Sequence, residues 1–148
     1  MILRSYKIRD CKKLINLFYN TVHTVNAKDY TSEQLDVWAP KNIDLRKWDH
    51  SFRRHKIVVA IEDNKIVGFG DIDKFGYLDR LFVDKNYQNQ GIATALCEEL
   101  EASVEGKKIT THASITAKLF FEQRDYRMIK EQKVLQNCIE LINFVMEK

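Results

Sequence analysis

The stretch Gln88-Asn89-Gln90-Gly91-Ile92-Ala93 lies between a predicted strand at 77–83 and a helical pattern that continues to Ser103. It fits the pattern Q/R-x-x-G-x-G/A. The first N–H groups of a helix have no intrahelical partner and carry partial positive charge, so a pyrophosphate can bind them directly. Gly91 and Ala93 have little or no side chain, which lets the backbone approach an anion closely. The turn predicts an anion-binding site, with a plain strand-to-helix turn as the alternative from these six residues alone.

Strand and helix signals alternate on both sides of this turn. Strands are expected at residues 2–8, 57–61, 65–72, 77–83, 109–112, 128–134 and 138–146. Helices are expected from Asp10 to near Asn26, from the capping box at Thr31 to Pro40, and at 44–54, 88–103 and 114–124. A helix between the strands at 77–83 and 109–112 makes them a parallel pair, whereas the hairpins on either side are antiparallel. This order predicts one mixed α/β domain over residues 1–148, with a mainly antiparallel sheet and flanking helices.

Length and composition limit the class of protein. A chain of 148 residues is the size of one domain, and its net charge of +3 comes from basic residues scattered among acidic ones, which does not indicate nucleic-acid binding. No uncharged run approaches the roughly 20 residues of a membrane span. The three cysteines, Cys11, Cys97 and Cys138, are far apart and in no metal-ligand spacing. We therefore expect a cytoplasmic protein with no metal, no membrane contact and no nucleic-acid partner.

Two longer segments resemble a known family. Residues 81–96, Leu-Phe-Val-Asp-Lys-Asn-Tyr-Gln-Asn-Gln-Gly-Ile-Ala-Thr-Ala-Leu, are similar to the acetyl-CoA-binding signature of the GNAT superfamily of acyl-CoA-dependent N-acyltransferases. Residues 117–126 resemble the family's later segment, in which an alanine and an aromatic residue precede Tyr-Glu-Lys-x-Gly-Phe. The order of the expected elements also matches the family's fold. The resemblance implies a central, splayed parallel strand pair and acetyl-CoA as the cosubstrate.

The resemblance assigns cofactor contacts to the strand and turn around Gly91. The backbone of the splayed strand would pair with the pantetheine arm at Leu81, Phe82 and Val83. The pyrophosphate position falls on Gln88, Asn89, Gln90, Gly91, Ile92, Ala93 and Thr94. Ser114 lies where many members have an asparagine, and could contact the cofactor, with a plain N-cap as the alternative. Phe121, also placed at the cofactor, stands at the family's tyrosine position and cannot donate a proton to a leaving thiolate.

A base is needed because the attacking amine must be neutral. Asp79 and Tyr77 are the catalytic candidates, since the period of two places them on one face of the strand with Leu81 and Val83. The alternatives are a surface or turn-capping carboxylate for Asp79 and a wall of the acceptor site for Tyr77. Further candidates are Asp71, Asp73 and His112, the last with a buried, hydrogen-bonded histidine as its alternative.

The resemblance implies that the helical segment before residue 57 forms a wall of the acceptor site, and several aromatic residues lie in this segment. Tyr30, Trp38 and Trp48 would suit a small ligand with an apolar part, and a plain role in the core is the alternative. The sequence thus predicts an N-acetyltransferase that moves the acetyl group of acetyl-CoA to a primary amine of a small molecule or peptide, by direct attack in a ternary complex.

Two other functions are compatible with parts of the sequence. A non-catalytic acyl-CoA-binding or regulatory module is the alternative, motivated by the phenylalanine at position 121. A transferase acting on aminoacyl-tRNA is disfavoured by the mild net charge and the missing tyrosine. The acceptor amine, the acyl-chain preference and the oligomeric state, including a homodimer, are left open by the sequence.

Overall fold

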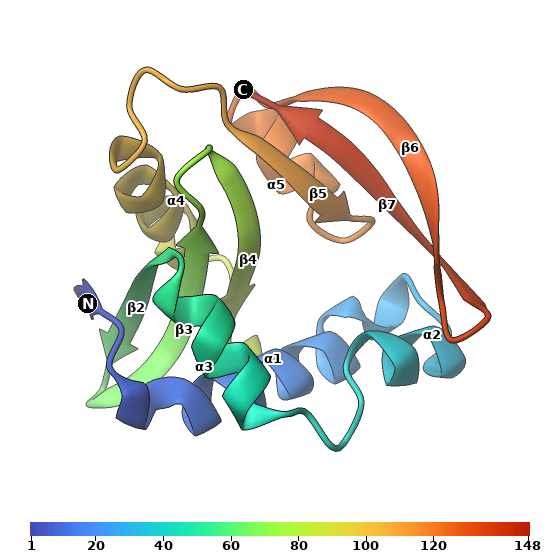
Figure 1. The fold of residues 1–148 in the computed structure, drawn as a ribbon, viewed down its shortest axis with the longest axis horizontal. Coiled ribbons are helices and arrows are strands. Elements are labelled where there is room, and N and C mark those ends of the chain that lie inside the picture. The colour runs from blue at the N-terminus through green and yellow to red at the C-terminus, as the bar shows by residue number, and fades with distance from the viewer.

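The computed structural model describes all 148 residues, and its central element is a seven-stranded sheet with the order β1-β2-β3-β4-β5-β7-β6 (Figure 1). The strands are β1 (Ile2–Ser5), β2 (Lys56–Glu62), β3 (Lys65–Ile72), β4 (Tyr77–Val83), β5 (Thr110–Ser114), β6 (Arg127–Gln136) and β7 (Ile139–Glu147). The α-helices are α1 (Cys11–Thr24), α2 (Ser32–Trp38), α3 (Leu45–Arg53), α4 (Ile92–Ala102) and α5 (Lys118–Gln123). Three short 3-10 helices are η1 (Ile8–Asp10), η2 (Asn26–Lys28) and η3 (Lys85–Tyr87). All neighbouring strands are antiparallel except β4 and β5, so the predicted fold class is confirmed.

The two helices next to the predicted cofactor turn are shorter than the sequence pattern indicates. The helix expected from residue 88 begins only at Ile92, because Asn89 and Gly91 have φ of 59° and 82°, outside the helical region. The helix expected at 114–124 is reduced to α5, since β5 extends through residue 114 and a turn follows it. Both differences lengthen the irregular backbone at the ends of β4 and β5.

The N-terminal helix also begins differently. Asp10 does not cap α1 with its side chain, as the sequence predicted. Its buried carboxylate instead binds the guanidinium of Arg4 at 2.8 and 2.9 Å and accepts the N–H of Lys7, and the hydrogen bond from Arg4 lowers its pKa. This ion pair fastens β1 to the start of α1. The capping box at Thr31 and Gln34 is confirmed.

Each face of the sheet carries a hydrophobic core. On one face α4 packs on β2, β3 and β4 and buries Leu96 and Leu100. On the other face α1 and α3 cover β2 and β3, burying Leu14, Phe52 and Phe69 (Figure 1). Because both faces of the central strands are covered, the backbone of β4 is held firmly between two layers.

β4 and β5 pair only over their first two residues. The register joins Tyr77 to Thr110 and Leu78 to Thr111, and the Thr111 hydroxyl donates to the Leu78 carbonyl at 2.8 Å. Beyond these pairs the two strands diverge and leave an opening in the middle of the sheet (Figure 1). The splayed parallel pair implied by the resemblance is therefore present, and it leaves one edge of β4 free from Asp79 onwards.

The β6–β7 hairpin arches away from β4 and reaches α2 with its tip (Figure 1). Two hydrogen bonds join them: Gln136 Nε2 donates to the Val37 carbonyl at 2.9 Å, and Gln34 Nε2 donates to the Glu140 carbonyl at 2.8 Å. The hairpin thus forms one side of a frame around the opening between β4 and β5. None of the helices has the length and apolar character needed to cross a membrane.

Candidate active site

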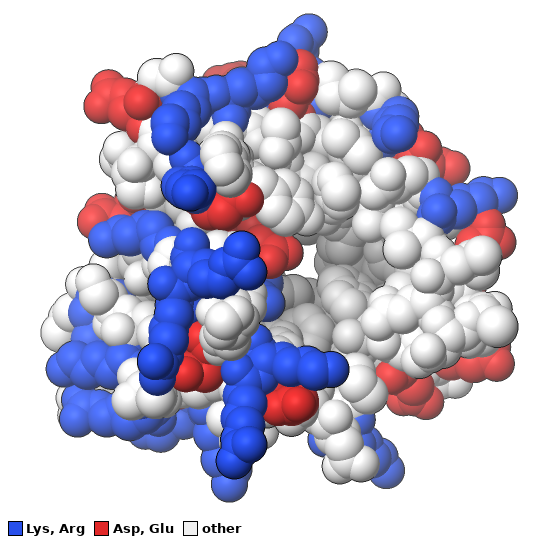
Figure 2. Space-filling view, in the orientation of Figure 1, with Lys and Arg blue, Asp and Glu red and all other residues white.

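Two cavities meet at the splayed end of β4. The first, which we call the aromatic cavity, has a volume of about 300 Å³ and lies between β4, β5, β7 and helices α1 to α3. The second, the turn cavity, has a volume of about 610 Å³ and follows the end of β4 into the start of α4. Four residues line both: Leu81, Phe82, Ser114 and Ala117. Figure 2 shows a recess in the middle of the molecule, bordered largely by uncharged residues.

The turn cavity is edged by backbone N–H groups without partners. From Gln88 to Thr94, no N–H donates a hydrogen bond to any group of the chain. The side chain of Gln88 turns back and donates to the carbonyls of Val83, at 2.5 Å, and Asp84, at 3.4 Å, which fixes the end of β4 against the turn. Gly91 has a left-handed φ of 82°, and nothing lies within 4 Å of the place where a side chain would begin. The turn therefore offers open donors at a helix N-terminus, as anion binding requires.

The predicted cofactor residues divide between the two cavities. Those that line the turn cavity are Leu81, Phe82, Val83, Gln88, Asn89, Gly91, Ile92, Ala93, Thr94 and Ser114. Gln90 is exposed and lines neither cavity, so only its backbone faces the turn. Phe121 lines the aromatic cavity instead. The structure thus brings the predicted strand and turn residues together along the turn cavity, whereas the predicted cofactor residues Gln90 and Phe121 do not line it.

Ser114 and Phe121 have other tasks in the structure. The Ser114 hydroxyl accepts the N–H of Ala117 at 3.1 Å and shapes the turn into α5, but Ser114 is not the N-cap of that helix, because the cap position is Ala117. Phe121 is 3% exposed and packs in the core, with its ring centroid 5.0 Å from that of Tyr126. The Tyr126 hydroxyl donates to Glu101 at 2.7 Å, and burial followed by this bond raises its pKa far above the ordinary range. The one tyrosine that lines the aromatic cavity, Tyr30, has its hydroxyl bound to the Ile115 N–H and the Ile142 carbonyl.

A β-bulge in β4 changes which side chains share a face. Ile72 pairs with Leu78 and Asp71 pairs with Arg80, so Asp79 is an extra residue in β4. Leu81 after the bulge packs against the α4 core, whereas Asp79 lies beside Arg80 on the opposite face. The prediction that Asp79 and Tyr77 share a face with Leu81 and Val83 is therefore wrong. A regular period of two does not continue through a bulge.

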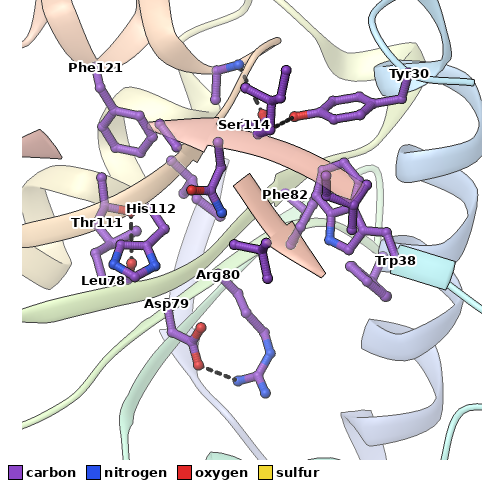
Figure 3. Close-up of a pocket in the computed structure, with 18 of the residues that line it drawn as sticks. Tyr30, Trp38, Leu78, Asp79, Arg80, Phe82, Thr111, His112, Ser114 and Phe121 are labelled. Atoms are coloured by element: carbon purple, nitrogen blue, oxygen red, sulfur yellow. Dashed lines mark hydrogen bonds and ion pairs between the residues drawn. The ribbon is translucent and has the colours of Figure 1, made fainter. Parts of the chain in front are cut away.

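Asp79 nevertheless lines the aromatic cavity. Its side chain is 33% exposed, and one carboxylate oxygen lies 3.6 Å from Nη1 of Arg80 (Figure 3). Burial raises the pKa of the Asp79 carboxyl, and the charge of Arg80 partly opposes this rise. A carboxylate that is open to a cavity and has a raised pKa is a stronger proton acceptor than an ordinary surface aspartate.

A charged network lies beneath Asp79. Asp71 is fully buried, and its Oδ2 accepts hydrogen bonds from Nη1 of Arg80 at 2.6 Å and from Nδ1 of His55 at 2.7 Å. The bond to Asp71 raises the pKa of His55. Oxygen and nitrogen atoms of Asp71, Asp79 and His55 lie within 4.8 Å of one another, a spacing that could hold a metal ion. Arg80 already brings a positive charge among them, which balances the carboxylates.

Arg80 is held in place by rings as well as by carboxylates. Its guanidinium carbon lies 4.6 Å from the centre of the Trp48 ring and 5.0 Å from that of Phe52, and Nη2 donates to the Ser51 hydroxyl at 3.1 Å. Sequence reasoning missed Arg80 and His55. The basic residue directly after Asp79 could have indicated an ion pair. In a regular strand, however, neighbouring side chains point to opposite faces, and only the bulge brings Asp79 and Arg80 to the same face.

The other proposed bases lie away from the cavities or on their rim. Tyr77 lines neither cavity; its ring centroid lies 5.2 Å from that of His112, and burial raises its pKa to about 12. Asp73 accepts the N–H groups of Phe75 and Tyr77 at 2.9 Å each, so it shapes the turn before β4. His112 is exposed and lines the aromatic cavity, unlike the buried histidine that was the alternative.

All three aromatic residues predicted for the acceptor site line the aromatic cavity. The Tyr30 hydroxyl accepts the N–H of Ile115 and donates to the Ile142 carbonyl, both at 2.9 Å, so it ties β5 and β7 to the segment before α2 (Figure 3). Trp38 and Trp48 are half-buried and present part of each ring to the cavity.

Comparison with known proteins decides the family. The pattern of the Acetyltransferase (GNAT) domain matches residues 26–148. The chain belongs to the GNAT acetyltransferases. It is 34% identical over 145 residues to the uncharacterized N-acetyltransferase YafP of Escherichia coli strain K12, covering 97% of this chain and 93% of the relative.

Solved structures agree with this assignment. A GCN5-related N-acetyltransferase from Rhodopseudomonas palustris superposes with a TM-score of 0.94 at 27% identity, covering 99% of this chain and 94% of that one. The PaiA N-acetyltransferase of Thermoplasma acidophilum, in complex with coenzyme A, has the same fold, with a TM-score of 0.80, 18% identity and coverage of 99% and 97%.

One further residue of this GNAT domain was missed by sequence reasoning. Asn143 on β7 lines the aromatic cavity next to Ser114, its partner in the β5–β7 register. Its amide oxygen is buried without a hydrogen-bond partner. A buried amide oxygen without a partner costs about 1–3 kcal/mol. No sequence signal marked it, because an asparagine in the middle of a strand has no motif around it.

Proposed function

We propose that this GNAT domain, acting as one unit over residues 1–148, moves an acetyl group from acetyl-CoA to a primary amine of a small molecule or peptide. The single observation that carries the proposal is the meeting of the turn cavity and the aromatic cavity along the free edge of β4. An acetyl donor held in the turn cavity and an amine held in the aromatic cavity would come together at Leu81, Phe82 and Ser114. This arrangement supports direct attack in a ternary complex.

The residues of the turn cavity fit acetyl-CoA. The open N–H groups from Gln88 to Thr94 would bind the pyrophosphate, and the backbone of Leu81, Phe82 and Val83 would pair with the pantetheine arm. The PaiA N-acetyltransferase in its complex with coenzyme A has the same fold. When bound, acetyl-CoA supplies an activated thioester carbonyl at the junction of the two cavities.

The proposed step is a single displacement. The neutral amine forms a bond to the thioester carbon, the carbon–sulfur bond breaks, and its electron pair leaves with sulfur as the CoA thiolate. The bound ammonium must first lose one proton, which Asp79 accepts directly or through a water molecule, and the nitrogen gives its second proton to solvent water after the new bond forms. A backbone N–H on the free edge of β4 would stabilise the oxyanion that develops on the carbonyl oxygen.

The thiolate leaves without a proton from residue 121. Phe121 has no hydroxyl, and the Tyr126 hydroxyl is bound to Glu101. The cost of this absence is modest, because a thiol with a pKa of about 8.5 is only ~2 kcal/mol from ionised at neutral pH. The departure from the family pattern therefore weakens acid catalysis without preventing the reaction.

A screen of primary amines with acetyl-CoA tests the proposed function. We expect release of free thiol that depends on the amine, together with a product heavier than the amine by one acetyl group in mass spectrometry. Saturable CoA binding with no thiol release for any amine would favour the non-catalytic acyl-CoA-binding module.

A cytoplasmic location and a homodimer stay predictions. All three cysteines are free in the structure.

A further inference from the structure

The aromatic cavity is small, and helices and strands border it on several sides. Its volume of about 300 Å³ is at the lower limit for ligand pockets, and a cavity of about 150 Å³ is known to hold one benzene molecule. The hydrogen bonds of Gln136 and Gln34 join the hairpin to α2, and those of Tyr30 join the segment before α2 to β7 and to the residue after β5. The space suits one ring with a short chain, and a polypeptide could insert only its end.

Aromatic rings form a continuous wall on one side of this cavity. The Phe18 ring centroid lies 4.9 Å from that of Trp48 and 5.0 Å from that of Phe82. The Phe82 ring centroid lies 6.4 Å from that of Trp38, and Figure 3 shows these two side chains on the same side of the cavity. Thirteen of the twenty residues that line the cavity are hydrophobic. Such a wall binds apolar and aromatic groups, and its ring faces also attract an ammonium ion.

The charged residues of the cavity favour a cation over an anion. Asp79 and Arg80 are the only lining residues with a permanent charge at neutral pH. The guanidinium of Arg80 is already bound to Asp71 and Ser51 and stacked on Trp48, so it has little left to offer a substrate carboxylate. Asp79 has only a long contact to Arg80, at 3.6 Å, and keeps a third of its side chain open.

We propose that the acceptor is a compact primary monoamine with an apolar body of about one ring and no carboxylate. Its ammonium group would bind at Asp79 before losing its proton, its body would lie on the wall formed by Phe18, Trp38 and Phe82, and the amide of Asn143 would be free to bind one polar group. This inference rests on the proposed acetyl transfer and specifies its acceptor.

Three probe amines separate the features of this acceptor. 2-Phenylethylamine has the ring and the amine, L-phenylalanine adds a carboxylate, and the peptide Phe-Gly-Gly adds a chain. We expect kcat/KM for 2-phenylethylamine to exceed that of the other two probes by about tenfold or more. The reason is that the cavity offers no free cationic partner for the carboxylate of L-phenylalanine and no room for the chain of the peptide. Equal or better use of L-phenylalanine or of the peptide would overturn the inference while leaving the proposed transferase function intact.

Tryptophan fluorescence provides a second measurement that does not depend on turnover. The chain has two tryptophans, Trp38 and Trp48, and both line the cavity, so 2-phenylethylamine should change the emission in a saturable way. Trp38→Phe and Trp48→Phe assign the signal to one ring. If the aryl amine binds but no amine is acetylated, the ligand class stands and the transferase function fails. If the aryl amine neither binds nor reacts, the inference is overturned.

Discussion

The turn cavity and the aromatic cavity lie side by side but are built in opposite ways. The turn cavity takes its anion-binding groups from consecutive backbone N–H groups at 88–94, one short stretch of chain. The aromatic cavity takes side chains from four helices and four strands that meet only after folding. The proposed cofactor contacts therefore depend on one local stretch of sequence, whereas the proposed acceptor contacts depend on tertiary structure. Changes in the two regions should therefore have separable effects.

The largest effect is expected at the turn. Gly91→Val places a branched residue at a φ of 82° and sets a side chain among the open N–H groups, so we expect the thermal stabilisation by CoA to disappear. Melting curves with and without CoA measure this directly.

Gly106→Val is the matched control for this change. Gly106 has a φ of 87° and equally open space, but it lines neither cavity. Both variants should lose about 1–2 kcal/mol of stability from the left-handed backbone, and only Gly91→Val should lose CoA binding. A folded Gly91→Val protein that binds CoA like the unaltered protein would show that the turn is not the cofactor site.

The next effect is expected at Asp79 and should leave the turn untouched. Asn at this position keeps the shape but cannot accept a proton, so Asp79→Asn should lower the acetyl-transfer rate by about 10²–10⁴-fold with unchanged CoA affinity. The loss should shrink as the pH rises, because more of the amine is already neutral. In the unaltered protein the rate should fall at acid pH as Asp79 becomes protonated, and burial raises the pKa of this carboxyl from its ordinary value.

Asp73→Asn is the control for Asp79, because Asp73 lines neither cavity and asparagine can still accept the N–H groups of the turn before β4. It should leave the rate profile in place. Equal rates for Asp79→Asn and the unaltered protein across the pH range would remove Asp79 as the base and leave a water chain.

A smaller effect is expected in the network below the aromatic cavity. The bond to Asp71 raises the folded-state pKa of His55 above its unfolded value near 6.5. The protonated pair therefore contributes stability fully below about pH 6.5, and this contribution is lost as the pH rises through the folded-state pKa.

His55→Gln should lower the free energy of unfolding by roughly 1.5–3 kcal/mol at pH 5.5, with a difference that shrinks as the pH rises. Denaturant melts over a pH series measure it, and CoA binding should not change. His50→Gln, at an exposed position on α3, controls for the loss of a histidine. A pH-independent difference would show that His55 acts only by packing.

The features of the molecule that depend on local sequence could be predicted, and those that depend on tertiary contacts could not. The strand order and the parallel pair follow from hydrophobic patterns and from the crossover helix, which are local signals with a general handedness rule. The residues of the turn follow from a motif. The face of Asp79 could not be predicted, because the bulge depends on how β3 and β4 align, and that register is set by the cores on both sides.

Arg80 and Asn143 could not be identified for a related reason. The place of each side chain in the site depends on contacts that form only in the folded protein. Arg80 is held by Asp71 and Trp48, and Asn143 is brought beside Ser114 by the pairing of β5 and β7. Helical aromatics such as Trp38 could be placed near the acceptor only because the family resemblance supplied the tertiary arrangement.

The smallest effect is expected at Phe121, which lines the aromatic cavity and stands at the family's tyrosine position. Phe121→Tyr restores the family's hydroxyl at a side chain that is 3% exposed and lines the aromatic cavity. We expect thiol release to be unchanged or raised, because a hydroxyl that reaches the junction could protonate the leaving thiolate. A hydroxyl that stays in the core without a partner would instead cost about 1–3 kcal/mol of stability. Melting temperature and rate, measured together, separate these outcomes: a stable protein with an equal or faster rate places the hydroxyl at the reaction, and a destabilised protein with an equal rate places it in the core. A tenfold loss of rate in a folded, CoA-binding protein would show that the junction depends on an apolar residue at 121, and thiolate departure there would have to be explained without any acid.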